Sequence, residues 1–185
     1  MSTILRLSLD EYHAMIARGA FNDLRDRHIE LIRGELREMA PQGPWHSETV
    51  TFLADWSSRS VGDAVKKRVQ LPISMRELDS EPEPDIVWAK AKSYRHQHPQ
   101  PADVLLLIEV AYSTLAADLG ENADLYARAG IADYWVVDLV HQTVHVFRQP
   151  SPAGYGSHER FVTGTQVMPL AFPAIALTVK ELFAE

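Results

Sequence analysis

Two carboxylates, Asp85 and Glu109, occupy positions where a carboxylate is costly unless other groups satisfy it. Asp85 follows a proline and opens the apolar segment DIVWA, and Glu109 interrupts the apolar run LLLIEV. An unpartnered carboxylate is strongly unfavourable in such surroundings. If the two segments are neighbouring strands, both side chains meet at one edge of a sheet, where the carbonyl group of Val110 could join them. These oxygen groups are ligands of the kind that Mg²⁺ or Mn²⁺ prefers.

A divalent cation held in this way points to a definite chemistry. It generates hydroxide from bound water and neutralises charge on a phosphodiester, as in a metal-dependent nuclease. A purely structural interpretation is also open, in which Asp85 caps a turn after Pro84 and Glu109 forms a buried ion pair with Arg68 or a lysine. The residue pattern alone does not place the two carboxylates side by side.

The first third of the chain contains the elements that must support this edge. The predicted elements are a helix that starts at a Ser8–Glu11 capping box and stops at Gly19, two short strands over 29–39 that turn near Arg33 and Gly34, a loop at 41–44 and a helix over 46–60. Within the second helix, we expect Val50, Leu53 and Trp56 to face the core.

The segment 64–74 alternates in polarity, which predicts a half-buried strand. Val65, Val69, Leu71 and Ile73 should share its buried face, and Lys66, Arg68 and Gln70 the other. The elements predicted after it are an acidic loop at 79–85, strands at 85–89 and 105–110 joined by a polar linker at 90–103, a helix over 115–129, strands at 133–139 and 144–148, and a short C-terminal helix near KELFAE. The strand–helix–strand order predicts a right-handed parallel crossover.

The bulk composition narrows the class of protein. The 185 residues are 46% hydrophobic and 23% charged, which is typical of a globular domain. We therefore expect one α/β domain over residues 1–185, with a mixed central sheet flanked by helices. The absence of cysteine excludes disulfides and thiolate zinc sites. Without a recognisable signal peptide or membrane span, we expect a cytoplasmic protein with no membrane partner.

A larger pattern surrounds the two carboxylates. It comprises Pro-Asp-Ile-Val at 84–87, Leu-Ile-Glu-Val at 107–110, Ser-Thr at 113–114, and a block at 126–138 that reads YARAGIADYWVVD. This pattern resembles the Uma-two family of putative restriction endonucleases, a branch of the PD-(D/E)XK nuclease superfamily. The segment 30–41 and the Leu-Phe pair at 182–183 fit the same resemblance, which therefore covers most of the chain and implies a restriction-endonuclease-like fold.

The resemblance implies roles for individual residues. Asp85 and Glu109 would be the metal-binding carboxylates, with Mg²⁺ or Mn²⁺ as the cofactor. Gln70 would lie on the strand before the Pro-Asp motif. Glu48 matches a helix position where the superfamily often has another acidic residue, although a solvent-exposed role fits it equally. His46 matches a position where the family often has histidine, and a helix-cap or loop contact is the alternative for it.

The sequence departs from the superfamily pattern at the lysine. The usual lysine position, two residues after the acidic residue, holds Ala111. Members of the resembled family supply a lysine from the next helix in a D-x-x-x-K-x-x-x-Y pattern, which here reads Asp118, Asn122 and Tyr126 on one helical face. Asn122 therefore occupies the lysine position, and its amide brings no positive charge.

The expected function is a metal-dependent DNA endonuclease in which the usual lysine is missing. Either Lys66 or Lys67 takes over its role, or the metal alone supports slow cleavage. The alternative is a catalytically inactive protein of the nuclease fold that binds nucleic acid or a partner protein. The net charge of −7 does not forbid DNA binding, because bound cations offset acidic ligands. We also expect a homodimer, since proteins of the resembled superfamily are often dimers.

Overall fold

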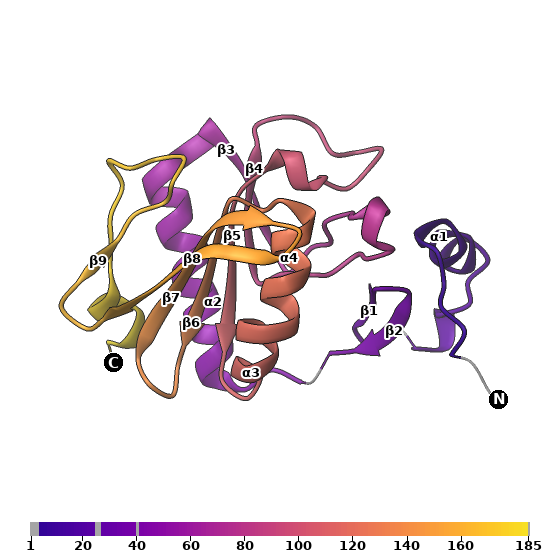
Figure 1. The fold of residues 1–185 in the computed structure, drawn as a ribbon, viewed down its shortest axis with the longest axis horizontal. Helices are drawn as coiled ribbons and strands as arrows, with labels where there is room; N and C mark the ends of the chain where they lie inside the picture. Colours follow the sequence, from indigo (N-terminus) through magenta and orange to yellow (C-terminus); the bar gives the residue numbers. More distant parts are fainter. Residues whose placement is uncertain (1–3, 25–26, 40, 185) are drawn as a thin grey trace.

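A six-stranded sheet forms the centre of the computed structural model, which describes residues 4–24, 27–39 and 41–184 (Figure 1). The strand order is β3-β4-β5-β6-β7-β8, with β5 and β6 parallel and the other neighbouring pairs antiparallel. The strands are β3 (Val65–Val69), β4 (Ile86–Lys90), β5 (Val104–Ala111), β6 (Asp133–Asp138), β7 (Thr143–Ser151) and β8 (Gly154–Val162). The predicted α/β class with a mixed central sheet is confirmed.

Helices cover both faces of this sheet. Helix α2 (Pro44–Val61) packs on one face, where Val50, Leu53 and Trp56 join the core as predicted. The connection between β5 and β6 packs on the other face and consists of α3 (Leu115–Ala117), a π-helical turn η5 (Asp118–Asn122) and α4 (Ala123–Ala129) (Figure 1). Successive strand residues point to opposite faces, so each strand contributes to both cores.

The helix predicted over 115–129 is therefore not a regular α-helix. Its middle is π-helical from Asp118 to Asn122, and this segment contains Gly120, a weak helix former. Single π-helical turns often occur at functional sites. Here the turn includes the buried Asp118, whose backbone carbonyl accepts a hydrogen bond from the hydroxyl of Tyr134 at 3.0 Å.

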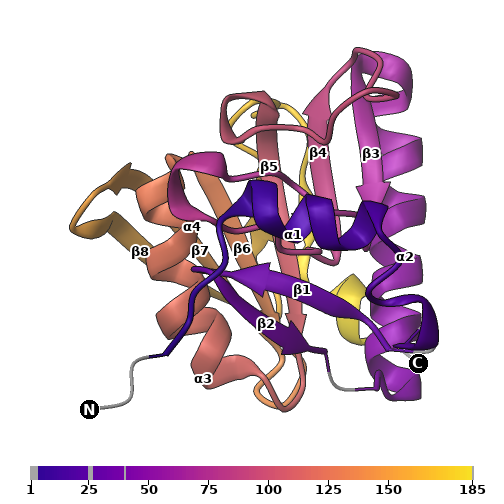
Figure 2. The same cartoon turned by 90° about the vertical axis from the view of Figure 1, so that its right-hand side faces the viewer.

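The N-terminal elements lie together on one side of the molecule, outside the central sheet (Figure 2). They are α1 (Leu9–Ala17), which has the predicted Ser8–Glu11 capping box, and a hairpin of β1 (Ile29–Ile32) and β2 (Glu35–Glu38). The hairpin turns at Arg33 and Gly34 as predicted. Two ion pairs attach it to the helical connection, Arg33 with Asp124 at 2.6 Å and Arg37 with Glu121 at 2.7 Å.

Shorter elements complete the described chain. They are β9 (Gln166–Val167), β10 (Leu177–Thr178) and the 3₁₀ helices η1 (Asn22–Leu24), η2 (Gly62–Ala64), η3 (Arg76–Leu78), η4 (Pro101–Asp103) and η6 (Val179–Phe183). The predicted C-terminal helix is the 3₁₀ helix η6. Among the described residues, no helix has the length and apolar character needed to cross a membrane.

Several predicted element boundaries are wrong, and the sequence does not predict β8. Helix α2 begins at Pro44, inside the predicted loop, because proline suits the first position of a helix. The strand predicted over 64–74 ends at Val69, and the side chains of Val69 and Leu71 are exposed and not buried. The strand ends because Gln70 adopts a left-handed backbone conformation with φ 49°, so the alternation of its side chains does not continue.

Candidate functional site

The antiparallel pairing of β4 with β5 brings Asp85 and Glu109 together. Ile86 pairs with Ile108, so the residues on either side of that pair are neighbours. The backbone N–H of Asp85 donates to Oε2 of Glu109 at 3.2 Å. Among the described residues, Glu109 forms no ion pair with Arg68 or a lysine, which was the alternative. The guanidinium of Arg68 donates to the carbonyl of Pro72 at 3.1 Å.

Asp85 is a buried acceptor for three different elements. Its Oδ2 accepts from the backbone N–H of Val110 at 2.8 Å, and the same oxygen lies 3.1 Å from Nε2 of His46 at the start of α2. Its Oδ1 accepts from Nε2 of Gln70, just after β3, at 3.1 Å. The structure thus places three predicted site residues, Gln70, His46 and Val110, around the carboxylate of Asp85, and a fourth, Glu109, at its backbone N–H.

Glu109 is held by α4 from the other side. The hydroxyl of Tyr126 donates to Oε1 of Glu109 at 2.7 Å. Burial raises the pKa of Glu109 well above its ordinary value, and the neighbouring carboxylates of Asp85 and Asp118 raise it further. Burial also raises the pKa of Tyr126, which keeps the phenol protonated as a donor. A bound cation would offset the crowding of negative charge here.

A cavity of about 380 Å³ opens onto both carboxylates. It is bounded by the end of β2, the start of α2 and the helical connection, and Asp118 and Asn122 line it. Thr114 Oγ1 and Asn122 Nδ2 donate to the carboxylate of Asp118 at 2.6 and 2.8 Å. Burial raises the pKa of Asp118, against the effect of these two donors. The amide in the lysine position is therefore engaged with Asp118 at the cavity wall.

His46 combines an electrostatic and a structural contact. Burial disfavours its charged form, but the hydrogen bond and charge of Asp85 outweigh that effect, so the pKa of His46 is raised. A raised pKa favours the protonated ring, which donates to Asp85. Its Nδ1 is buried and makes no hydrogen bond within the described part of the chain. The prediction that His46 belongs with the acidic pair is thus consistent with its position.

The structure does not bring every predicted residue to the cavity. Glu48 is exposed on α2 and does not line the cavity, which corresponds to its solvent-exposed alternative. Lys66 and Lys67 are also absent from its lining, and Lys67 Nζ donates to the carbonyl of Gly62 at 3.0 Å. The structure therefore does not place either lysine at the cavity wall, where the predicted replacement of the missing lysine needs one of them.

Two side chains make contacts at the site that the sequence does not predict. Arg37 of β2 lines the cavity, where it is bound by both carboxylate oxygens of Glu121 at 2.7 and 2.8 Å. Nothing in the polar hairpin sequence distinguishes Arg37 from its neighbours. Tyr126 ends the Asp118–Asn122–Tyr126 pattern, and this spacing is the available signal for its contact with Glu109.

The donor set suits a hard divalent cation. Ionised carboxylates offer about four acceptor positions each, and Asp85 and Glu109 together receive five hydrogen bonds or close contacts. Acceptor capacity therefore remains on both. Across the described residues, no group of three or more acidic or histidine side chains converges as a complete metal cage. Mg²⁺ typically uses one or two carboxylates and completes its shell with water and substrate phosphate.

The fold is shared with a structurally characterised nuclease-like protein. A crystal structure described as "a putative nuclease belonging to DUF820 from Anabaena variabilis ATCC 29413" superposes with a TM-score of 0.74 over 96% of this chain and 97% of that chain, at 19% identity. The Uma2 family model, described as "Putative restriction endonuclease", matches residues 9–180. The chain therefore belongs to the Uma2 family. No curated protein matches it.

Proposed function

We propose that this protein is a metal-dependent nuclease that hydrolyses phosphodiester bonds of DNA. The observation that carries the proposal is the pair Asp85 and Glu109, which line one cavity and are joined by a hydrogen bond from the Asp85 backbone N–H to Glu109 Oε2 at 3.2 Å. Membership of a family described as "Putative restriction endonuclease" supports the same class of reaction.

Asp85 and Glu109, with the carbonyl of Val110, would hold Mg²⁺ or Mn²⁺. When bound, such an ion supplies charge neutralisation and an acidified water. The protein's own groups fix the two carboxylates in place. Gln70 Nε2 and the Val110 N–H hold the two oxygens of Asp85 separately, and Tyr126 holds Glu109.

The residue in the lysine position, Asn122, determines the expected rate of DNA cleavage. Asn122 donates to Asp118 and places no positive charge in the cavity. Arg37 is the arginine in the described lining, and Glu121 neutralises it. Because preorganised positive charge contributes strongly to phosphoryl chemistry, we propose slow, metal-supported cleavage without a lysine.

The test is cleavage of supercoiled plasmid, linear duplex and single-stranded DNA with Mg²⁺, Mn²⁺ or a chelator. Glu109→Gln and Asp85→Asn remove charge with little change in shape and should abolish cleavage. Glu48→Gln is the matched control on the exposed side of α2 and should cleave at the wild-type rate. Cleavage that persists in Glu109→Gln, or that withstands the chelator, would overturn the proposal.

One observation favours a second function. No lysine lines the described cavity, so the chain could have kept the nuclease fold as a binding protein without catalysis. Calorimetric titration with Mn²⁺ separates the two, because a protein that has abandoned metal chemistry should bind the ion weakly. Tight Mn²⁺ binding that Glu109→Gln removes would argue for the nuclease.

We also propose a homodimer, on the basis of the family resemblance. Size-exclusion chromatography with light scattering would test it directly. A single species at the chain mass of 20.8 kDa would show that the protein is a monomer.

A further inference from the structure

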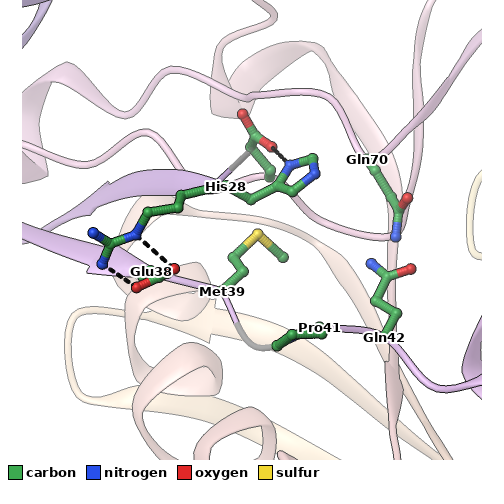
Figure 3. A pocket seen from close by; sticks show the side chains of 8 residues that line it. His28, Glu38, Met39, Pro41, Gln42 and Gln70 are labelled. Atoms are coloured by element: carbon green, nitrogen blue, oxygen red, sulfur yellow. Dashed lines mark hydrogen bonds and ion pairs between the residues drawn. The ribbon is translucent and has the colours of Figure 1, made fainter. Parts of the chain in front are cut away.

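A second pocket of about 320 Å³ adjoins the cavity on the side of Gln70 (Figure 3). We call it the amide pocket. It shares five lining residues with the cavity, namely Glu38, Met39, Pro41, Gln42 and Glu83, and adds Arg27, His28 and Gln70. Because Gln70 also binds Asp85, the amide pocket borders the proposed reaction centre directly.

Two glutamine amides give the amide pocket its hydrogen-bonding character. The side chains of Gln42 and Gln70 point toward one another from opposite walls (Figure 3). The carboxylate of Asp85 can only accept when ionised, which fixes the Nε2 of Gln70 toward it and leaves Oε1 of Gln70 as an acceptor. Gln42 makes no side-chain hydrogen bond with any described residue, so both its donor and its acceptor are available.

The backbone of Gln70 indicates that its position is specified. Its φ of 49° lies in the left-handed region, which is unfavourable for a residue other than glycine. A hydrogen bond from Gln70 N to the carbonyl of Asp85 at 3.1 Å holds this conformation. Such conformations persist where the surrounding structure fixes them, and they are frequent at ligand sites. The same residue thus connects the carboxylate to the amide pocket through both backbone and side chain.

The remaining walls suit a flat, uncharged ligand. Arg27 is paired with Glu38, and Nδ1 of His28 lies 3.8 Å from Oε2 of Glu83, so each acidic side chain of the wall has a basic side chain beside it (Figure 3). Met39 adds a thioether, which makes favourable contacts with aromatic rings. A ligand with an aromatic face would contact the thioether of Met39, and a donor and acceptor edge on the same ligand would bind the two glutamine amides.

From this geometry we infer that the amide pocket binds an unpaired nucleobase of DNA, next to the phosphodiester that lies at Asp85 and Glu109. The inference rests on the proposed function and adds its base specificity. A glutamine amide pairs with the N6 amino group and N7 of adenine through one donor and one acceptor. Gln70 Oε1 adds a second acceptor, which favours a base with an exocyclic amino group. We therefore assign adenine as the preferred base.

Binding tests the inference without requiring cleavage. The Glu109→Gln protein is titrated with short oligothymidylate strands that carry one central adenine, one central abasic site, or thymine throughout. Adenine should tighten binding about tenfold over the abasic strand, the size expected for one amide–base pair. In Glu109→Gln with Gln42→Ala this difference should fall below about twofold. Gln166→Ala, an exposed glutamine on β9, is the matched control and should preserve it.

Sequencing of the cleavage ends gives a second readout. Wild-type protein should cut preferentially beside adenine, and Gln42→Ala should reduce that preference. Base-dependent binding without any cleavage would support the amide pocket and overturn the nuclease proposal. Metal-dependent cleavage with equal binding of adenine and abasic strands, or with an unchanged preference in Gln42→Ala, would overturn the amide pocket and leave the nuclease proposal standing. Absence of single-strand binding would also overturn the amide pocket.

Discussion

The two faces of the central sheet are covered by helices in similar ways but carry different chemistry. On the α2 face, Trp56 stacks on Trp88 with ring centroids 5.2 Å apart, and Trp135 lies 6.4 Å from Trp56. On the α4 face, the same strands present Glu109, which meets Tyr126 from the helix. The difference arises within single strands, since Ile108 and Glu109 are adjacent and point to opposite sides.

The contrast separates stability from function. The α2 face buries mainly large apolar side chains, and its buried carboxylate, Asp133, is compensated by an ion pair with Arg148 at 2.8 Å. The α4 face buries Glu109 and Asp118. Burial raises the pKa of both carboxyl groups, because it removes water from their charged forms. Residues retained despite such a cost are candidates for function. Substitutions on the two faces should therefore have opposite consequences, which the following predictions test.

The largest effect is expected from Trp88→Ala on the α2 face. Trp88 is fully buried, and its Nε1 donates to Ser57 Oγ at 2.8 Å. Removing a buried tryptophan should lower the free energy of unfolding by about 3–5 kcal/mol. Urea denaturation measures the change, and Val69→Ala at an exposed site of β3 is the control. A loss below about 1 kcal/mol would show that this face does not hold the fold together.

The next effect concerns the metal on the α4 face. Mn²⁺ at a hundred times its dissociation constant should stabilise the wild-type protein by about 2.7 kcal/mol. Glu109→Gln should abolish this gain, whereas Glu48→Gln should keep it. Thermal unfolding with and without Mn²⁺ provides the measurement. Equal stabilisation of all three proteins would place the ion elsewhere.

A smaller effect is expected at the lysine position. Asn122→Lys places an ammonium beside Asp118 in the cavity and should raise the cleavage rate about tenfold or more, because it supplies preorganised positive charge. Asn22→Lys, at an exposed position, adds the same charge outside the cavity and should leave the rate unchanged. An unchanged rate in correctly folded Asn122→Lys would mean that this position does not face the reacting phosphate.

The sequence predicted the apolar framework, because it follows from alternation within strands. It placed Asp85 beside Glu109 only through the family resemblance, since the residue pattern alone does not show that the two strands are neighbours. It could not predict the left-handed backbone of Gln70, which ends β3 early and exposes Val69. That conformation depends on a tertiary hydrogen bond to the carbonyl of Asp85. Such a contact between distant residues cannot be inferred from local conformational propensity.

The cavity lining shows the same limit. Lys66 and Lys67 are the candidates in the sequence for the role of the missing lysine, yet they do not line the cavity. Arg37 reaches it from a hairpin attached through Glu121, an ion pair between residues far apart in the chain. The sequence identifies residue types and local faces, but which loops close a cavity depends on how separate elements pack.

The smallest expected effect is a dependence of stability on pH that belongs to the α4 face. Burial raises the pKa of Glu109 above the ordinary glutamate value of 4.5, so the folded protein binds this proton more tightly than the unfolded chain. The stabilisation is complete below about pH 4.5 and is lost as the pH rises toward the pKa of the folded state. In the absence of divalent metal, the wild-type protein should therefore lose stability relative to Glu109→Gln over this interval. Paired urea titrations across the range measure the difference.

Leu53→Ala on the α2 face provides the contrast for this pH dependence. Its stability should lie below that of wild type by a constant amount at every pH, because it removes no titrating group. A Glu109→Gln curve parallel to that of wild type would show that the carboxylate is not penalised by burial. The two faces would then not differ in electrostatic cost, and the cost itself would no longer be evidence that Glu109 is retained for a metal.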